Sequence, residues 1–194
     1  MIVVITPEEH VQNETEIINE LFQEGLDLLH IRKPFIDEEE MKGFIEEINP
    51  EFHAQLVLHS HYDLAKDFKI SRFHFREIDR QNRLSQPFED KIISTSVHDM
   101  ETFNELGNEW EYSFVSPVFP SISKKGYGEN STILNDIKRR KNSKVKLVAL
   151  GGINESNIHE VFGENTNGVA LLGVIWENKE PIRIFRKCRQ NVLS

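Results

Sequence analysis

The most constraining feature of this sequence is a repeated alternation between short apolar runs and amphipathic stretches of helical length. Apolar runs that suit a β-strand begin near residues 2, 28, 55, 70, 92, 112, 145 and 169. Helical periodicity follows most of them; after the first run, for example, Ile18, Leu21 and Phe22 share one helical face. Asp37 with Glu40 three residues later is a capping-box start for the helix after the second run, and residues 154–162 are also predicted to be helical. Strands that alternate with helices pair in parallel, because a parallel pair needs a crossover connection. The pattern therefore predicts an α/β protein with a parallel sheet.

Eight such units in succession favour a closed (β/α)8 barrel, the TIM barrel, over an open doubly wound sheet. The open sheet usually has fewer strands and a glycine-rich turn after its first strand. Here that turn reads Thr6-Pro7-Glu8 and contains no glycine. At 194 residues the chain is short for a barrel, so we expect tight loops and some missing helices. No linker or repeat divides the chain, and residues 1–194 are expected to form a single domain.

The net charge of −9 argues against two classes of partner. Proteins that bind nucleic acid or anionic membranes through their overall field are normally basic. The sequence shows no apolar stretch of membrane-spanning length and no signal-peptide pattern at its N-terminus. A single cysteine, Cys188, rules out an intrachain disulfide and is typical of a reducing compartment. We therefore expect a cytoplasmic protein without nucleic-acid or membrane partners. The sequence does not decide between a monomer and a homo-oligomer.

Polar residues gather just after the predicted strands, which is where a barrel places its functional loops. Glycines after the last two strands let backbone N–H groups approach an anion. Arginine and lysine side chains supply local positive charge, and serine hydroxyls can donate hydrogen bonds to phosphoryl oxygens. An acidic chain can bind a phosphorylated ligand where such groups converge. The residues expected at this mouth are His30, Arg32, Lys33, His59, Ser60, His61, Arg76, Glu77, Asp79, Ser96, Ser121, Ile122, Ser123, Lys124, Lys125, Gly126, Gly151, Gly152 and Gly173.

Two closely spaced histidines, His59 and His61, raise a metal-binding alternative. Residues two apart on a strand point the same way, and imidazole is a common zinc ligand. The sequence indicates no third ligand beside them, so a metal hydrolase is the less favoured alternative. His74 lies in the middle of a predicted strand and is expected to be a satisfied histidine of the core or of the bottom face.

Several stretches, in chain order, resemble the thiamine phosphate synthase family and its thiazole tautomerase relatives. The most specific one, residues 116–126, reads SPVFPSISKKG and looks like the family's Gly-Pro-Val-Phe-Pro-Thr-x-Thr-Lys-x-Gly. Residues 29–33 are similar to the family's Gln-x-Arg-x-Lys, with His30 in place of glutamine as in tautomerase relatives. Further similar stretches lie at 56–65, 73–79, 148–153 and 167–170. The resemblance covers nearly the whole chain.

This resemblance implies a reaction that joins a hydroxymethylpyrimidine diphosphate to a thiazole phosphate and releases pyrophosphate. In the family the diphosphate leaves first, and the thiazole nitrogen attacks the resulting pyrimidine-stabilised cation. The enzyme's task is then to neutralise the departing diphosphate and to hold the nucleophile in line. The partners implied are the two phosphorylated small molecules, and the cofactor implied is Mg²⁺.

Site residues are carried over by position. The resemblance implies that catalytic side chains face the diphosphate, and these are Arg32, His59, Ser96 and Lys124. Other positions would hold the thiazole phosphate, partly through backbone groups, and these are Ser121, Ser123, Gly152, Leu172 and Gly173. Asp79 matches one of two magnesium-binding aspartates.

The chain departs from the family pattern at three positions. Ser60 stands where the family has its other magnesium aspartate, and the last lysine of the Gln-x-Arg-x-Lys segment falls at Pro34. Pro117 stands where tautomerase relatives can carry a catalytic histidine. Two alternatives to the transferase therefore stay open. One is a metal-independent thiazole phosphate tautomerase that uses His30 or His59 as acid–base, and the other is a non-catalytic binding protein of the thiamine pathway.

Overall fold

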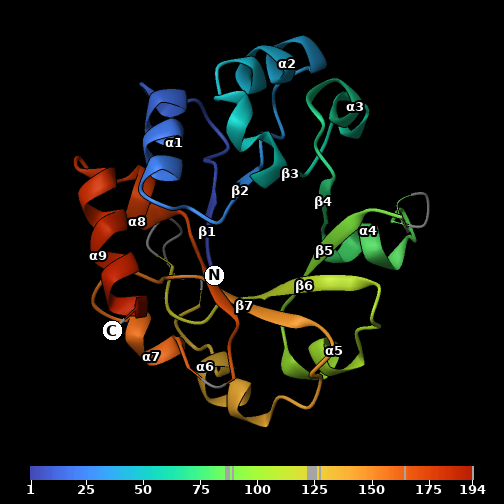
Figure 1. The fold of residues 1–194 in the computed structure, drawn as a ribbon. Coiled ribbons are helices and arrows are strands. Elements are labelled where there is room, and N and C mark those ends of the chain that lie inside the picture. Colours follow the sequence, from blue (N-terminus) through green and yellow to red (C-terminus); the bar gives the residue numbers. More distant parts are fainter. Residues whose placement is uncertain (86–87, 89, 122–125, 127, 164, 194) are drawn as a thin grey trace.

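The computed structural model describes residues 1–194 except 86–87, 89, 122–125, 127, 164 and 194 (Figure 1). Within this described part, eight strands form one closed barrel, each pairing in parallel with the next. The first and last strands close the ring through the pairing of Val3 with Ala170. The predicted (β/α)8 barrel is therefore confirmed. The strands are β1 (Ile2–Ile5), β2 (Leu28–Ile31), β3 (Leu56–Leu58), β4 (Arg72–Phe75), β5 (Ile92–Val97), β6 (Trp110–Val115), β7 (Lys146–Leu150) and β8 (Gly168–Leu171).

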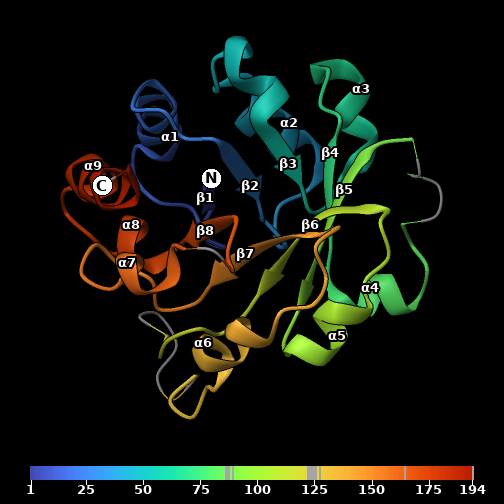
Figure 2. The same ribbon diagram turned by 60° about the horizontal axis from the view of Figure 1, so that its bottom comes forward.

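Helices surround the strands on the outside of the barrel (Figures 1 and 2). Helices α1 and α9 lie side by side, so the two ends of the chain pack against each other. The α-helices are α1 (Glu14–Gln23), α2 (Glu38–Glu46), α3 (Ala65–Phe68), α4 (Glu77–Gln81), α5 (Met100–Glu105), α6 (Ile133–Asp136), α7 (Ile158–Val161), α8 (Gly173–Trp176) and α9 (Pro181–Leu193). Short 3₁₀ turns are η1 (Pro50–Gln55), η2 (Tyr62–Leu64) and η4 (Ile137–Arg139). In the described chain, no helix is long and apolar enough to span a bilayer.

Local chemistry explains where helices begin and why some are short. Helix α2 begins as predicted: the Glu40 backbone N–H donates to the Asp37 carboxylate, and the Asp37 N–H donates to the Glu40 carboxylate. The helix predicted over 154–162 is reduced to α7. Asn154 accepts from the backbone of Ser156 and donates its own N–H to the side chain of Asn157. These local side-chain bonds replace the first helical turn.

Apolar side chains fill two layers. One layer lies between the strands and the helices, and in α9 it includes Phe185 and the buried thiol of Cys188. Burial raises the pKa of Cys188 to about 12, as expected for a packing thiol. The second layer fills the barrel interior and contains Val3, Leu28, Val57, Tyr112, Phe114, Val148 and Ala170. Because neighbours along a strand face opposite sides, Leu28 and His30 point into the barrel, whereas Leu29 and Ile31 point to the helices.

Candidate active site

A pocket of about 480 Å³ opens at the carboxyl ends of the strands, which is the face where barrel enzymes bind substrates. Residues from the ends of all eight strands or from the loops after them contribute to its wall. Four of the site residues that the family resemblance implies line it: Arg32, His59, Ser96 and Leu172. Apolar side chains, including Ile5, Phe114 and Leu150, form much of the remaining wall.

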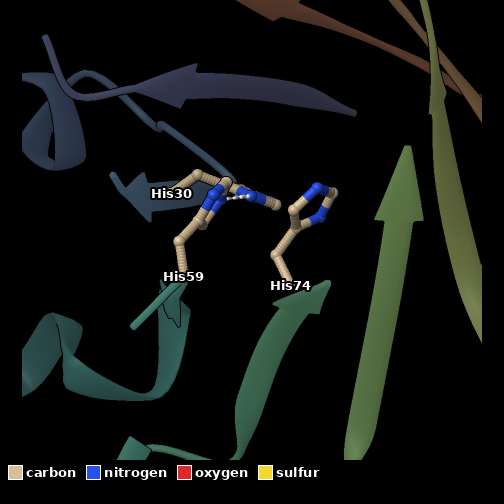
Figure 3. A group of neighbouring side chains, drawn as sticks. All are labelled: His30, His59 and His74. Carbon is tan, nitrogen blue, oxygen red and sulfur yellow. Dashed lines mark hydrogen bonds between the residues drawn. The ribbon is translucent and has the colours of Figure 1, made fainter. Parts of the chain in front are cut away.

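Three histidines converge at the floor of this pocket, and Figure 3 shows them on three successive units of the barrel. His30 lies on β2, His59 directly follows β3 and His74 lies on β4. Nδ1 of His30 is 2.8 Å from Nε2 of His59, and the rings of His59 and His74 stack with centroids 4.4 Å apart. One nitrogen from each ring lies within 4.8 Å of the others.

The third member of this group, His74, corrects the sequence analysis. His74 is buried, as expected, but it lines the pocket at the mouth of the barrel and does not lie at the bottom face. A signal for the group was present in the sequence. The pairs Leu29-His30, Leu58-His59 and Phe73-His74 each place a histidine after a large apolar residue near the end of a strand. Comparing the three strand ends would have predicted that the histidines meet.

Hydrogen bonds hold the outer nitrogens of two of the rings. Nε2 of His30 is 2.6 Å from the Tyr112 hydroxyl. Nδ1 of His74 is 2.9 Å from Oγ of Ser94, and its Nε2 is 2.9 Å from Oγ of Ser96. The predicted site residue Ser96 therefore joins the pocket wall to the histidine group.

Burial sets the protonation state of the three imidazoles. Desolvation lowers the pKa of His30 and of His59 well below the usual value, and the neighbouring positive charges lower both further. Desolvation likewise lowers the pKa of His74 to about 3, although Asp79 opposes the shift. All three rings are therefore neutral near pH 7, and each retains a lone pair on one nitrogen.

Two arginines provide charge at the entrance. Arg32 pairs with Glu8 at 2.5 Å, and its side chain is 37% exposed. The Arg32 backbone N–H donates to the Thr6 hydroxyl, which fixes the chain as it leaves β2. Arg76 pairs with Asp79 at 2.9 Å, and its side chain is 69% exposed. Both residues line the pocket, and both are among the polar residues that follow the predicted strands.

The prediction for Lys33 is wrong in its location. Its Nζ donates to the Glu14 carboxylate at 2.8 Å and to the Glu9 carbonyl at 3.0 Å, and its side chain is 3% exposed. Successive side chains point in opposite directions after β2, so Arg32 reaches the pocket and Lys33 turns toward α1. Lys33 serves a buried ion pair and adds no charge to the pocket entrance.

Glycines after β7 let the loop after β6 approach closely. Gly152 has φ +63°, and a Cβ there would lie 2.2 Å from the Pro120 carbonyl oxygen. The Phe119 N–H donates to the Gly151 carbonyl at 3.1 Å, which holds the two segments together. Gly173 begins α8, directly after the pocket residue Leu172. Ser121 is the last described residue before the gap at 122–125, and the predictions for Ile122, Ser123 and Lys124 fall outside the described residues.

The side chains at the entrance do not suit magnesium. Both carboxylate oxygens of Asp79 accept hydrogen bonds from Arg76, which holds the pKa of Asp79 below its usual value. Glu77 pairs with Arg80, and the hydroxyl of Ser60 is hydrogen-bonded to His61. Magnesium binds through carboxylates and phosphate oxygens, whereas the innermost groups here are imidazoles. The expected role of Asp79 as a magnesium ligand would first require its release from Arg76.

Comparison with known proteins agrees with this fold. The family model described as thiamine monophosphate synthase matches residues 2–175. The thiamine-phosphate synthase of Dictyoglomus turgidum is 26% identical over 181 residues, which cover 90% of this chain and 80% of the relative. That of Clostridium tetani is 25% identical over 175 residues, or 87% of this chain and 82% of the relative.

Solved structures lead to the same family. The thiamine phosphate pyrophosphorylase from Bacteroides thetaiotaomicron superposes with a TM-score of 0.81 at 26% identity, over 98% of this chain and 96% of that one. The thiamine phosphate pyrophosphorylase from Pyrococcus furiosus shares the fold, with a TM-score of 0.78 at 21% identity over 99% and 95% of the two chains. Since the family model spans nearly the full length and the barrel carries its pocket at the expected face, the chain belongs to the thiamine monophosphate synthase family.

Proposed function

We propose that the protein is a transferase that couples a hydroxymethylpyrimidine diphosphate to a thiazole phosphate and releases pyrophosphate. The observation that carries this proposal is the family match over residues 2–175, together with a pocket lined from all eight strand ends. The partners are then two phosphorylated small molecules. The single cysteine favours the cytoplasm as the place of reaction.

Positive charge at the pocket entrance suits the departing diphosphate. The C–O bond of the pyrimidine diphosphate breaks, and its electron pair leaves with the diphosphate, so negative charge grows at the oxygens. Arg32 and Arg76 are the guanidinium groups that line the pocket, and their present carboxylate partners are exchangeable because both pairs are partly exposed. Electrostatic stabilisation of this kind is a large contribution to catalysis. Arginine side chains, and not a magnesium ion, neutralise the diphosphate in this proposal.

Apolar wall residues suit the heterocycles. Ile5, Phe114 and Leu150 line the pocket and would pack against the planar rings. They would also exclude water, which otherwise competes with the thiazole nitrogen for the pyrimidine cation. Backbone groups near Gly152 and Gly173 would hold the thiazole phosphate. Lys124 is still predicted to contact the diphosphate, and Ser121 and Ser123 to contact the thiazole phosphate. Ile122 is still a predicted substrate-binding residue.

Incubation of the purified protein with the two precursors tests the proposal. We expect the coupled phosphate product, detected by chromatography, in equal amount to the pyrophosphate released. The reaction should increase little when Mg²⁺ is added to the purified protein. Failure to form product at high enzyme concentration, with or without added Mg²⁺ or Zn²⁺, would contradict the transferase. Conversion of a thiazole phosphate tautomer without coupling would favour the tautomerase alternative instead.

A further inference from the structure

The three histidines at the pocket floor form an arrangement that the transfer reaction leaves unused. One nitrogen from each of His30, His59 and His74 lies within 4.8 Å of the others, and Figure 3 shows the rings converging from three neighbouring units. Three imidazole nitrogens bound to one zinc ion at about 2.0–2.1 Å would lie roughly 3.3 Å apart in a tetrahedral site. Binding of an ion therefore requires the three nitrogens to move closer together, with Nε2 of His74 turning from Ser96 toward the other two rings.

Hydrogen bonds fix the rings of His30 and His74, and in the present arrangement the His30 ring directs a nitrogen at another ring of the group (Figure 3), whereas both nitrogens of His74 contact serines of β5. Tyr112 holds Nε2 of His30 at 2.6 Å, which leaves Nδ1 facing His59. Ser94 holds Nδ1 of His74 at 2.9 Å, which leaves Nε2 directed at Ser96 on the pocket wall. In metal sites, a partner on the second nitrogen fixes the tautomer and the ring orientation of a histidine ligand. Two of the three rings already have such a partner.

We propose that His30, His59 and His74 bind one transition-metal ion of the Zn²⁺ class, through Nδ1, Nε2 and Nε2 respectively. Imidazole suits zinc and the neighbouring first-row metals, whereas magnesium prefers oxygen ligands. Ser96 gives up its bond to His74 when the ion enters. Three protein ligands leave one coordination position open, as in zinc sites that bind a substrate or a water molecule.

The open position faces the pocket, because His59, His74 and Ser96 all line it. The described metal-binding group contains no carboxylate, so an ion held by three neutral rings keeps its double charge and favours an anionic fourth ligand. A phosphoryl oxygen of the diphosphate meets that need and would lie below the arginines of the entrance. This choice of fourth ligand rests on the proposed function, whereas the binding of the ion itself does not.

Titration of the metal-free protein with Co²⁺ tests the site independently of activity, because tetrahedral Co²⁺ has characteristic visible absorption. We expect the band to saturate at a single ion per chain and Zn²⁺ to displace it. His59→Gln and His74→Gln should each weaken Co²⁺ binding by about 100-fold or more, and Tyr112→Phe, which keeps the packed ring, by about 10–100-fold. The control His159→Gln changes an exposed histidine on α7 and should leave Co²⁺ binding unchanged. Circular dichroism checks that each variant is folded.

The outcomes separate the metal site from the transferase. No Co²⁺ band in the folded wild-type protein, or an equal band in the folded histidine variants, would overturn the metal site. Pyrophosphate should change the Co²⁺ spectrum, and an unchanged spectrum would overturn the phosphoryl oxygen as fourth ligand. Metal binding without product formation supports the site and contradicts the transferase. Full product formation by the metal-free protein contradicts a role of the ion in the reaction and supports the transferase.

Discussion

Basic side chains lie at two depths of the same pocket, an entrance with Arg32 and Arg76 and a floor with three histidines. At the entrance the guanidinium groups are partly exposed, and each pairs with a carboxylate, Glu8 or Asp79. At the floor the imidazoles contact one another, Tyr112 and serine hydroxyls. Burial lowers their pKa values, so they are neutral near pH 7.

The difference shows that depth and counter-charge together decide what a basic residue contributes. A charged group needs either water or an opposite charge nearby, because desolvation of an isolated charge is costly. The entrance therefore contributes positive charge toward phosphoryl groups. The floor contributes lone pairs, which can accept a proton or bind a metal ion but cannot neutralise a diphosphate.

The largest effect is expected for a substitution of Lys33. This residue tests how much a neighbouring opposite charge matters, because it is a basic residue buried beside Glu14. Lys33→Met would leave the Glu14 carboxylate buried without its partner. We expect the free energy of unfolding to fall by about 3–5 kcal/mol, measured by urea denaturation. The double variant Lys33→Met/Glu14→Met should recover much of the loss. A loss below about 1 kcal/mol, typical of exposed pairs, would show that counter-charge matters little at this depth.

Acid should destabilise the floor. The folded-state pKa of His74 is about 3, below the usual value of 6.5, and those of His30 and His59 are also lowered. Below pH 6.5 the unfolded chain therefore binds more protons than the folded one, so stability falls as the pH falls. His74 alone contributes up to about 1.4 kcal/mol per pH unit between pH 6 and pH 5, and His30 and His59 act in the same direction.

Denaturation of the metal-free protein at several pH values measures this slope. His74→Gln should make the slope shallower, because one of three titrating rings is removed. His10→Gln is the matched control, since the His10 side chain is 79% exposed, and it should leave the slope unchanged. A flat stability profile between pH 6.5 and pH 5 would mean that the floor histidines are not neutral and buried in the folded protein.

Arg32 tests the charge at the entrance. Arg32→Gln should lower kcat/KM for the coupling reaction by about 100-fold, as removal of a group that stabilises developing negative charge does. Stability should change by less than about 1 kcal/mol, because the pair with Glu8 is partly exposed. Arg183→Gln removes a similar exposed pair on α9 and should leave both quantities unchanged. Equal activity of the two variants would contradict a role of Arg32 in holding the diphosphate.

The smallest effect is expected for a substitution of Gly152. It tests whether close backbone packing, and not charge, shapes the opposite side of the entrance. Gly152→Ala places a Cβ against the Pro120 carbonyl at a positive φ, and we expect a cost of about 1–3 kcal/mol in thermal or urea unfolding. Gly43→Ala is the control. No heavy atom lies within 4 Å of a Cβ at Gly43, and alanine in a helix is favoured by about 0.5–1 kcal/mol. Equal effects of the two substitutions would contradict the close approach.

Much of the fold could be predicted because its signals are local. The short apolar runs of the strands and the capping pair Asp37 and Glu40 each depend on neighbours in the chain. The helix predicted at 154–162 was too long because asparagine side chains competed for the backbone at its start. Part of the site was equally local, since Arg32, His59, Ser96 and Leu172 follow strand ends and do line the pocket.

The sequence itself determined the order of strands and helices, because periodicity and strand ends are properties of short segments. That order gives a barrel with its polar groups at one end. Only the tertiary structure decided which basic side chains are charged beside a carboxylate and which are buried as neutral imidazoles that carry a lone pair. Closure of the barrel brought His74 beside His30 and His59 and turned Lys33 toward Glu14. Such neighbours come from distant segments, and burial and counter-charge depend on them and not on the residue type.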